Sequence, residues 1–373
     1  MQRCRARPRA DWQEKFAALG FSFHSADDGY WDESACYRFS ADQVDELEAA
    51  TQELQRLTLA AVEHVVAEQR CSELLIPSSF IAGVERSWLA KEASLYGRFD
   101  LAYDGHQPPK LLEYNADTPT SLLEAAVAQW QRLEETGRPH QFNSLHEKLI
   151  ERWRAIAALW PQSSPLHLSC AKDSDEDRIT VEYLRDTALH AGLEASFVYV
   201  EDIGWNGASF VDDDGTRLHA WFELYPWEWL MREPFAPHVA TATPCSLEPP
   251  WKALLSNKGI LAVLWELFPN HPNLFPAYRC PDYLGASFIK KPLLSREGAN
   301  ISIIDRSGDT QTDGPYGAEG FVYQARAAIP QLDGRYPVIG SWVVGDEPAD
   351  IGIREDATPI TTNMSRFVPH YFD

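Results

Sequence analysis

The chain has 373 residues, of which 45% are hydrophobic and 24% are charged, and its formal net charge is -22 at pH 7. This length exceeds what one simple hydrophobic core covers, so two or more packed units are expected. The acidic excess argues against a nucleic-acid partner and an anionic membrane, but it leaves room for a polyphosphate ligand in a local basic pocket.

The cysteines and the apolar runs bear on the cellular compartment of the protein. The six cysteines are scattered and form no CxxC pair, so they indicate neither a zinc site nor a disulfide framework. No apolar run approaches the length of a membrane span, and the basic start of the chain has no apolar stretch of the secretory-signal kind. We therefore predict a cytoplasmic protein with reduced thiols and no contact with a membrane.

Several helices are predicted in the first 160 residues, among them a short one near 80–91. Residues 9–20 form another short one, Ser40 is a good N-cap for a long helix over 41–71, and residues 143–159 have amphipathic spacing. The proline-bounded stretch 161–165 then predicts a break, where a second unit begins.

A β-hairpin is predicted between these helices, in the stretch YGRFDLAYDGHQPPKLLEYNADTPTSLLE. Alternating residues over 96–103 and 110–114 predict two strands, and Asp104-Gly105 is a strong turn pair.

A polar loop and a helix follow the hairpin. Residues 115–120 are small and polar, and residues 121–130 have helical spacing. Thr120 or Ser121 stands where an N-cap would, and Glu124 is placed to complete a capping box.

Four polar side chains are expected to share one face of the hairpin. Arg98 and Asp100 point the same way along the first strand, as do Glu113 and Asn115 along the second. Two carboxylates and an amide oxygen suit Mg²⁺, which usually shares its oxygen ligands with phosphates. From the spacing alone, however, the commoner explanation is a solvated sheet face that carries an Arg–Asp ion pair.

From residue 165 the pattern changes to alternating strands and helices, which predicts a small α/β unit. The expected elements are a strand over 166–170, an acidic loop over 173–177, a helix over 179–191, a strand over 195–200 and a hairpin from 209–211 and 218–222. The aromatic segment 221–229 is interpreted as core packing or a domain interface rather than as a platform for a ligand.

The last third contains a helical segment with Lys258 and then a strand, loop and strand. The first strand ends at Lys291, and the basic loop 295–300 leads to a strand over 301–304. Such a loop can present N–H groups and Arg296 to phosphates and can close over them as a lid. Another predicted hairpin has its strands at 336–344 and 351–354.

Several motifs, in the order in which they occur, together resemble one family. They are RFD, EYNADTPTS, NK before LWELFP, the KP…R-x-G-x-N loop and a late Gly-x-Arg. They are similar to the synthetase domain of the glutathionylspermidine synthase family, over nearly the whole chain.

The resemblance implies an α/β (α+β) fold. This would be a circularly permuted ATP-grasp fold, in which the metal-binding strands precede the lysine-bearing half, with an additional small α/β unit of the pre-ATP-grasp kind. The expected division is 1–160 for the N-terminal part with the metal-binding hairpin, 161–249 for the substrate unit, and 250–373 for the nucleotide-binding part with the lid loop.

The resemblance also assigns roles to single residues. Arg98, Arg296 and Arg354 match active-site arginines, and Arg98 also contacts the transferring phosphate. The metal ligands are Asp100, Glu113 and Asn115, which reverses the preference for a solvated face. The nucleotide residues are Lys258, Lys291, Gln324 and Ala325, where the last two form the adenine hinge. The substrate residues are Thr118, Thr120, Glu176 and Asp177.

The implied reaction joins a small-molecule carboxylate to an amine, with ATP and two Mg²⁺ ions. Transfer of the γ-phosphoryl group gives an acyl phosphate, and the amine then displaces phosphate. Two departures bear on the substrates. The chain offers no segment for the amidase of bifunctional family members, and the two threonines stand where the family has serines. Glutathione and spermidine are therefore candidate substrates only.

Two other functions fit the same scaffold. One is a non-catalytic ATP-binding regulator or adaptor, against which the intact metal set speaks. The other is a carboxylate kinase that stops at the acyl phosphate.

Overall fold

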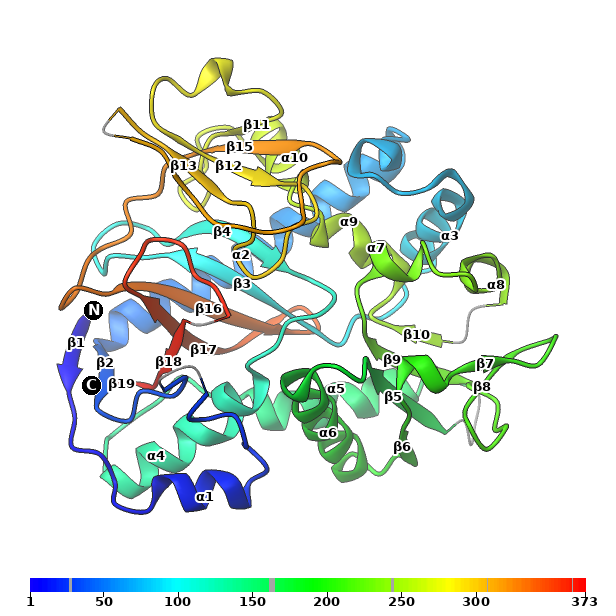
Figure 1. Ribbon diagram of the computed structural model, residues 1–373, viewed down its shortest axis with the longest axis horizontal. Coiled ribbons are helices and arrows are strands. Elements are labelled where there is room, and N and C mark those ends of the chain that lie inside the picture. The colour runs from blue at the N-terminus through cyan, green and yellow to red at the C-terminus, as the bar shows by residue number, and fades with distance from the viewer. Residues whose placement is uncertain (27–28, 161–164, 243–244, 307, 364) are drawn as a thin grey trace.

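The computed structural model describes residues 1–26, 29–160, 165–242, 245–306, 308–363 and 365–373. In Figure 1 a central antiparallel sheet lies below a second antiparallel sheet, and a small parallel sheet lies to the lower right. The expected break at 161–165 lies, apart from Pro165, outside the described residues.

The central sheet joins the two halves of the chain. Its order is β18-β17-β16-β3-β4, and every neighbouring pair is antiparallel. The strands are β3 (Tyr96–Ala102), β4 (Lys110–Asn115), β16 (Tyr336–Val344), β17 (Glu347–Asp356) and β18 (Arg366–Val368). Two of the predicted hairpins, β3–β4 and β16–β17, are therefore confirmed.

Helices cover both faces of this sheet. Ile339 and Val343 of β16 share a core with α2 (Ala41–Ala67), whereas Trp342 and Val344 share one with α5 (Leu145–Ala157), because alternate residues of a strand face opposite ways. The predicted N-cap of α2 is confirmed, since Ser40 accepts a hydrogen bond from the backbone N–H of Gln43. Helix α4 (Gln129–Thr136) stands between the polar loop and α5 in the sequence.

The second antiparallel sheet lies against the outer edge of β4. Its order is β11-β15-β12-β13-β14, from the strands β11 (Ala277–Tyr278), β12 (Phe288–Pro292), β13 (Ser302–Ile304), β14 (Thr310–Gln311) and β15 (Phe321–Ala325). Gln324 Nε2 donates to the Leu111 carbonyl at 3.0 Å, and Lys291 Nζ donates to the Leu112 carbonyl at 2.8 Å. These side chains bind polar groups at a sheet edge that would otherwise be open.

The parallel sheet has the order β10-β9-β5-β6. Its elements are β5 (Leu166–Cys170), α6 (Asp175–His190), β6 (Ala195–Phe197), β9 (Ala220–Leu224) and β10 (Cys245–Leu247). The hairpin expected from 209–211 and 218–222 is formed only at its turn, where Val211 bridges Arg217 and the Leu218 N–H donates to the Phe210 carbonyl at 3.0 Å. The rest of the expectation is wrong, because β8 (Phe210–Val211) pairs with β7 (Gly204–Trp205) while β9 pairs with β5 and β10. All of β9 is buried, which is typical of a strand inside a parallel sheet.

The termini lie close together on one side of the molecule (Figure 1). There β2 (Ala35–Phe39) pairs with β1 (Gln2–Arg5) and with β19 (His370–Phe372). Further helices among the described residues are α1 (Trp12–Ala18), α3 (Ser78–Leu89), α7 (Trp227–Leu230), α8 (Ala236–Ala242), α9 (Ala253–Ser256) and α10 (Ile260–Leu267).

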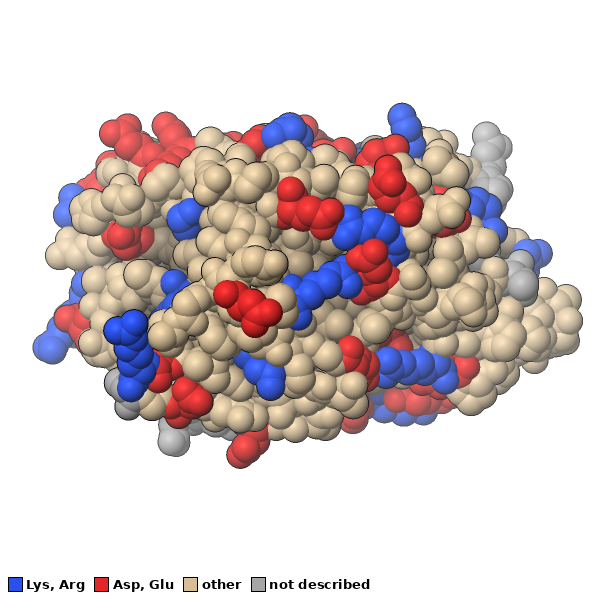
Figure 2. Space-filling view, turned by 90° about the horizontal axis from the view of Figure 1, so that it is seen from above, with Lys and Arg blue, Asp and Glu red and all other residues tan. Residues whose placement is uncertain are grey.

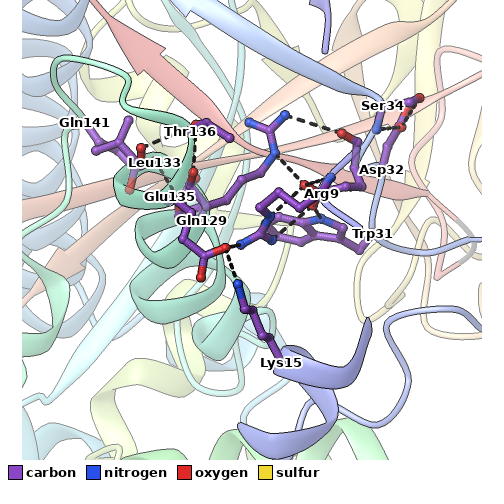
Figure 3. A network of polar contacts seen from close by, with 12 residues as sticks. Arg9, Lys15, Trp31, Asp32, Ser34, Gln129, Leu133, Glu135, Thr136 and Gln141 are labelled. Atoms are coloured by element: carbon purple, nitrogen blue, oxygen red, sulfur yellow. Dashed lines mark hydrogen bonds and ion pairs between the residues drawn. The ribbon is translucent and has the colours of Figure 1, made fainter. Parts of the chain in front are cut away.

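A polar network ties the N-terminal segment to α4 (Figure 3). Glu33 accepts hydrogen bonds from Arg9 Nε and Trp31 Nε1, both at 2.8 Å, and Arg132 Nε lies 3.4 Å from the same carboxylate. Arg9 also donates to Glu135 at 3.0 Å. Glu33 is only 4% exposed, so it is the shared buried acceptor of this network.

The helix after the polar loop begins differently from the prediction. It starts at residue 122 and contains a π-helical stretch, Glu124–Ala128. The expected capping box is wrong, because Ser121 has a φ of +69° and its Oγ lies 3.0 Å from the Tyr30 hydroxyl. Glu124 is 1% exposed, and burial, with the nearby Glu176 adding to it, raises the pKa of Glu124 to about 8.

Charges of both signs are interspersed on the face shown in Figure 2, and uncharged residues cover most of it. The net charge of -22 therefore does not gather into one acidic patch on this face. In the described ranges, no helix is both long enough and apolar enough to cross a membrane.

The Glu33 network should contribute strongly to stability. Glu33→Ala leaves Arg132 buried without its carboxylate, so we expect the free energy of unfolding to fall by about 3–5 kcal/mol. Urea unfolding measures this. The control is Asp373→Asn, which breaks the exposed ion pair with Arg38 and should cost less than about 1 kcal/mol. Equal losses in the two variants would contradict the assignment.

Glu124 should make stability depend on pH. The folded state holds its proton more tightly than the unfolded chain, with a pKa of about 8 against 4.5. The free energy of unfolding should therefore fall as pH rises from 4.5 towards 8, by up to about 1.4 kcal/mol per pH unit. Glu124→Gln cannot ionise and should lose this fall, which urea unfolding of both proteins between pH 5 and 8 would show. If the free energy of unfolding changes with pH in the same way in both proteins, this role of Glu124 is refuted.

Candidate active site

The register of β3 and β4 brings four polar side chains to one face. Arg98 lies opposite Asn115, and Asp100 lies opposite Glu113, as predicted from the hairpin. A β-bulge follows Asp100, a feature that often re-aims side chains next to active sites. Arg98 and Asp100 are 5% and 2% exposed, so the alternative of a solvated face is wrong, although the Arg–Asp ion pair that it included is present at 2.8 Å.

Arg98 and Arg354 hold Asp100 from two sides. Arg354 Nη2, from β17, donates to Asp100 Oδ2 at 2.7 Å, while Arg98 Nη1 donates to the Thr120 carbonyl at 2.7 Å. Gly340 of the intervening strand β16 leaves room for Arg98, because a Cβ there would lie 2.9 Å from Arg98 Cδ. The two arginines are thus fixed on a rigid sheet.

Two lysines approach Glu113 from other segments. Lys258 lies between α9 and α10, and its Nζ is 3.0 Å from Glu113 Oε2, while Lys291 on β12 donates to the neighbouring Leu112 carbonyl. Burial acts to raise the pKa of Glu113, but Lys258 and Lys291 outweigh it and lower that pKa to about 2. Burial lowers the pKa of Lys291 to about 8, against the opposing effect of Glu113. Glu113 is therefore ionised at neutral pH.

The candidate metal ligands form a mixed oxygen set. Where the structure describes the chain, no group of three or more His, Cys, Asp and Glu is placed to hold a metal ion. Asp100 and Glu113 are only two carboxylates, and the third member is the amide of Asn115. Its Oδ1 is the atom that could ligate a cation, whereas its Nδ2, which is buried without a hydrogen-bond partner, is a donor suited to an acceptor such as a phosphate oxygen. The residues thus fit a hard cation such as Mg²⁺.

An apolar cavity of about 680 Å³ lies between β4 and the second sheet. This volume includes open solvent, and its walls combine isoleucines from several segments with the charged residues Asp100, Glu113, Lys291 and Arg326. An apolar cavity with a few charged groups suits a ring that carries a charged tail.

The two predicted hinge residues lie differently with respect to this cavity. Gln324 lines it, and its side chain is held by the Leu111 carbonyl. Ala325 is not among the lining residues, and its backbone N–H donates to the Pro276 carbonyl at 2.7 Å. Arg326 and Ala327 line the cavity beyond it.

A wider, polar cavity adjoins the first. Its empty volume is about 1280 Å³, including open solvent, and it shares Glu113, Gly298 and Thr361 with the apolar cavity. The structure places in its lining the following predicted residues: Arg98, Asn115, Thr118, Thr120, Glu176, Asp177, Arg296 and Arg354. The predicted substrate residues and active-site arginines thus surround one space.

One wall of the polar cavity is acidic. Glu176 and Asp177 were expected in a loop, but α6 already begins at Asp175, because Ser174 caps it by accepting a hydrogen bond from the Asp177 backbone N–H. Burial, with Glu176 adding to it, raises the pKa of Asp177 to about 7. The cavity is therefore lined by both arginines and carboxylates.

The aromatic segment divides between core and cavity. Trp221 and Trp227 are buried, as predicted, but Tyr225 and Trp229 line the polar cavity, and Trp229 is 40% exposed. Core packing alone is thus the wrong interpretation of these two residues.

The predicted lid loop reaches across the polar cavity. Arg296 donates to Glu228 Oε1 through Nε at 3.1 Å and through Nη2 at 2.9 Å, and its Nη1 donates to the Thr118 hydroxyl. Gly298 has a φ of +69°, and a Cβ there would clash with the Thr361 carbonyl. The loop thus lies between α7 and the C-terminal segment.

Sequence reasoning missed Glu228, Thr361 and Asn363. The first pairs with Arg296, and the other two line the polar cavity. Glu228 stands between two tryptophans, and this acidic residue in an aromatic run was the available signal. Nothing in the local pattern marks the other two.

Comparisons with known proteins agree on one family. The family model of the glutathionylspermidine synthase preATP-grasp matches residues 3–373. A putative acid–amine ligase of Haemophilus influenzae is 41% identical, over 98% of this chain and 97% of its own length. The trypanothione synthetase of Crithidia fasciculata is 30% identical over 83% of this chain, and the bifunctional glutathionylspermidine synthetase/amidase of Escherichia coli is 25% identical over 89%. The chain spans 52% and 58% of these two longer relatives.

A solved structure shows the same fold. The glutathione synthetase-like effector from Globodera pallida superposes with a TM-score of 0.60 and 10% identity, over 99% of this chain and 98% of that one. Together with the match over residues 3–373 and the relative that is 41% identical, this leads to one conclusion: the chain belongs to the glutathionylspermidine synthase family.

Proposed function

We propose that the protein is an ATP-dependent ligase that joins a small carboxylate to an amine through an acyl phosphate. The observation that carries this proposal is the cross-strand pair Asp100 and Glu113: Glu113 lines both cavities, Asp100 lines the apolar one, and cations surround the pair. The names of the relatives, a putative acid–amine ligase and two synthetases, support the same reaction class.

The apolar cavity is the proposed seat of ATP. Its isoleucines and Gln324 would enclose the adenine, while Lys258 and Lys291 would bind the phosphates near Glu113. Because Ala325 lies off the cavity wall, we expect its part in the hinge to be structural. The order of these parts along the chain supports a circularly permuted ATP-grasp fold, since the metal-binding strands precede the lysines.

Asp100, Glu113 and Asn115 are the proposed ligands of two Mg²⁺ ions. Bound there, the ions would neutralise the phosphate oxygens and align them for transfer. Asp100 is now paired with Arg98 and Arg354, and Glu113 with Lys258, so the same cations can shift towards the phosphates once metal takes the carboxylates.

The polar cavity is the proposed place of both other substrates. Arg98 and Arg354 would hold the donor carboxylate near the γ-phosphate, and Thr118 and Thr120 would bind the rest of the donor. The amine is a cation before it reacts, so the wall that carries Glu176 and Asp177 suits it. Arg296 would cover the site and help to exclude water, which would otherwise hydrolyse the acyl phosphate.

The decisive assay is ADP release from Mg-ATP against a matrix of carboxylates and amines, with glutathione and spermidine included. A ligase should release ADP only when both partners are present, and mass spectrometry should find one amide per ADP. Release with a carboxylate alone, with a hydroxamate trapped by hydroxylamine, would indicate a kinase instead. ATP binding without release for any pair would favour a regulator.

The metal assignment predicts the effect of Glu113→Ala. Loss of this carboxylate should lower kcat by at least about 1000-fold, because the charge of the transferring phosphoryl group is no longer neutralised in place. The fold should persist, since the change removes no core volume. The control is Glu347→Ala, at the exposed start of β17 in the same sheet, which should keep full activity. Near-normal turnover of Glu113→Ala would refute the assignment.

A further inference from the structure

We infer that Glu228 is a positioning residue that latches the lid loop through Arg296 and keeps water out of the polar cavity. The inference rests on the proposed function for its effect on turnover, but the latch itself is a matter of geometry. It goes beyond the roles already given to Arg296, because the partner that holds this arginine lies in a different unit of the fold.

The contacts of Arg296 join three separate segments. Its guanidinium donates twice to Glu228 of α7, once to the Thr118 hydroxyl, and lies 3.8 Å from Asp117. It also lies over the ring of Trp229, 5.9 Å from its centroid. One side chain of the loop is thus bound to both the α/β unit and the loop after β4.

The surroundings make this ion pair stronger than a surface pair. The side chains of Glu228 and Arg296 are 14% and 24% exposed, and one carboxylate oxygen accepts two N–H groups. Charge-assisted bonds with restricted access to solvent are screened less by water and salt. Asp117 is the more distant partner, since its Oδ1 lies 3.8 Å from the guanidinium and its Oδ2 is held in place by the Trp227 backbone N–H at 3.2 Å.

The backbone of the loop needs such an anchor. Glu297 and Gly298 have φ values of +55° and +69°, and neither belongs to a helix or a strand. Glu297 is not a residue that favours this region, so the loop does not hold its shape by local preference. The loop is fixed on the side of its own sheet by the close approach of Gly298 to Thr361, by the Thr312 hydroxyl bonded to the Gly298 carbonyl, and by Asn300 Oδ1, which accepts the Tyr316 N–H at 2.7 Å. The Arg296–Glu228 pair is the contact that ties it to α7.

A loosened lid has a defined chemical consequence. Water could then attack the acyl carbon of the acyl phosphate, the bond from that carbon to the phosphate oxygen would break, and phosphate would leave. The donor carboxylate would be regenerated, so ATP would be consumed without amide formation. The ratio of ADP to amide therefore measures the latch, whereas a purely structural role would lower both products together.

The first test needs no substrate. Hydrogen exchange of residues 293–300 in the full chain should become about tenfold faster in Glu228→Ala, because one charge-assisted pair no longer opposes opening. Glu228→Gln, which keeps an acceptor of the same shape, should lie between the variant and the wild type. The matched control is Glu319→Gln, since Glu319 and Arg232 join the same two parts of the molecule at 3.5 Å through a more exposed pair. It should not change the exchange.

The second test uses whichever substrate pair gives ADP. Glu228→Ala should form several ADP molecules per amide, Glu228→Gln fewer, and Glu319→Gln one, as the wild type does. If hydrogen exchange of the loop in Glu228→Ala is no faster than in the Glu319→Gln control, the latch is refuted, whatever the activity. Faster exchange with an unchanged ADP to amide ratio would overturn its role in excluding water. If the wild type releases no ADP at all, the proposed function fails, and the exchange measurement still decides the latch.

Discussion

Two carboxylates that face each other inside the protein are the constraint around which this structure is arranged. Asp100 and Glu113 are cross-strand neighbours in β3 and β4, and buried like charges oppose ionisation. Glu113 is nevertheless ionised, because Lys258 reaches it from the break between α9 and α10 and Lys291 lies near it on β12. Arg354 of β17 pairs with Asp100. The pKa of Glu113 is about 2 in spite of burial, which shows how strongly the nearby lysines stabilise its ionised form. The placement of three distant segments follows from this need.

A second pair of buried charges holds the hairpin in position. Glu248, at the end of β10, accepts the backbone N–H groups of Leu95 and Tyr96 at 2.9 and 3.0 Å. Lys252 donates to the carbonyls of Tyr96 and Ala116 at 3.0 and 2.9 Å. Burying a charge is costly unless hydrogen bonds satisfy it, and here the backbone supplies them. The segment that leaves the parallel sheet is thereby fixed to the chain just before β3 and just after β4.

Local patterns predicted what local forces decide. The β3–β4 hairpin, with its shared polar face, and the capped start of α2 were predictable because alternation, the Asp-Gly turn and Ser40 act within a few residues. The predictions failed where tertiary contacts decide. Ser121 binds Tyr30 instead of capping a helix, and β9 pairs with β5 rather than with its sequence neighbour.

The candidate site shows the same limit. The pairing of Arg98 and Asp100 follows from i, i+2 spacing, but Arg354 stands more than 250 positions away, and only the resemblance indicated it. The part of Glu228 was hidden for another reason. A carboxylate between two tryptophans is typical of the edge of a hydrophobic core. Only the fold shows that a loop from the second sheet lies opposite Glu228.

The site divides its charges between a rigid sheet and a loop. Asp100, Glu113 and Arg354 stand on strands whose backbones are paired on the central sheet, so their separation changes little when a ligand enters. Arg296 stands on a loop with left-handed residues and is held by its ion pair with Glu228. A positive charge on a loop can move without disturbing the charges that are fixed on the sheet. The entropy of closing long loops grows only slowly with their length, so drawing these groups from distant segments costs little more than a local site would. The gain is that the closing charge and the fixed charges are free to act at different times.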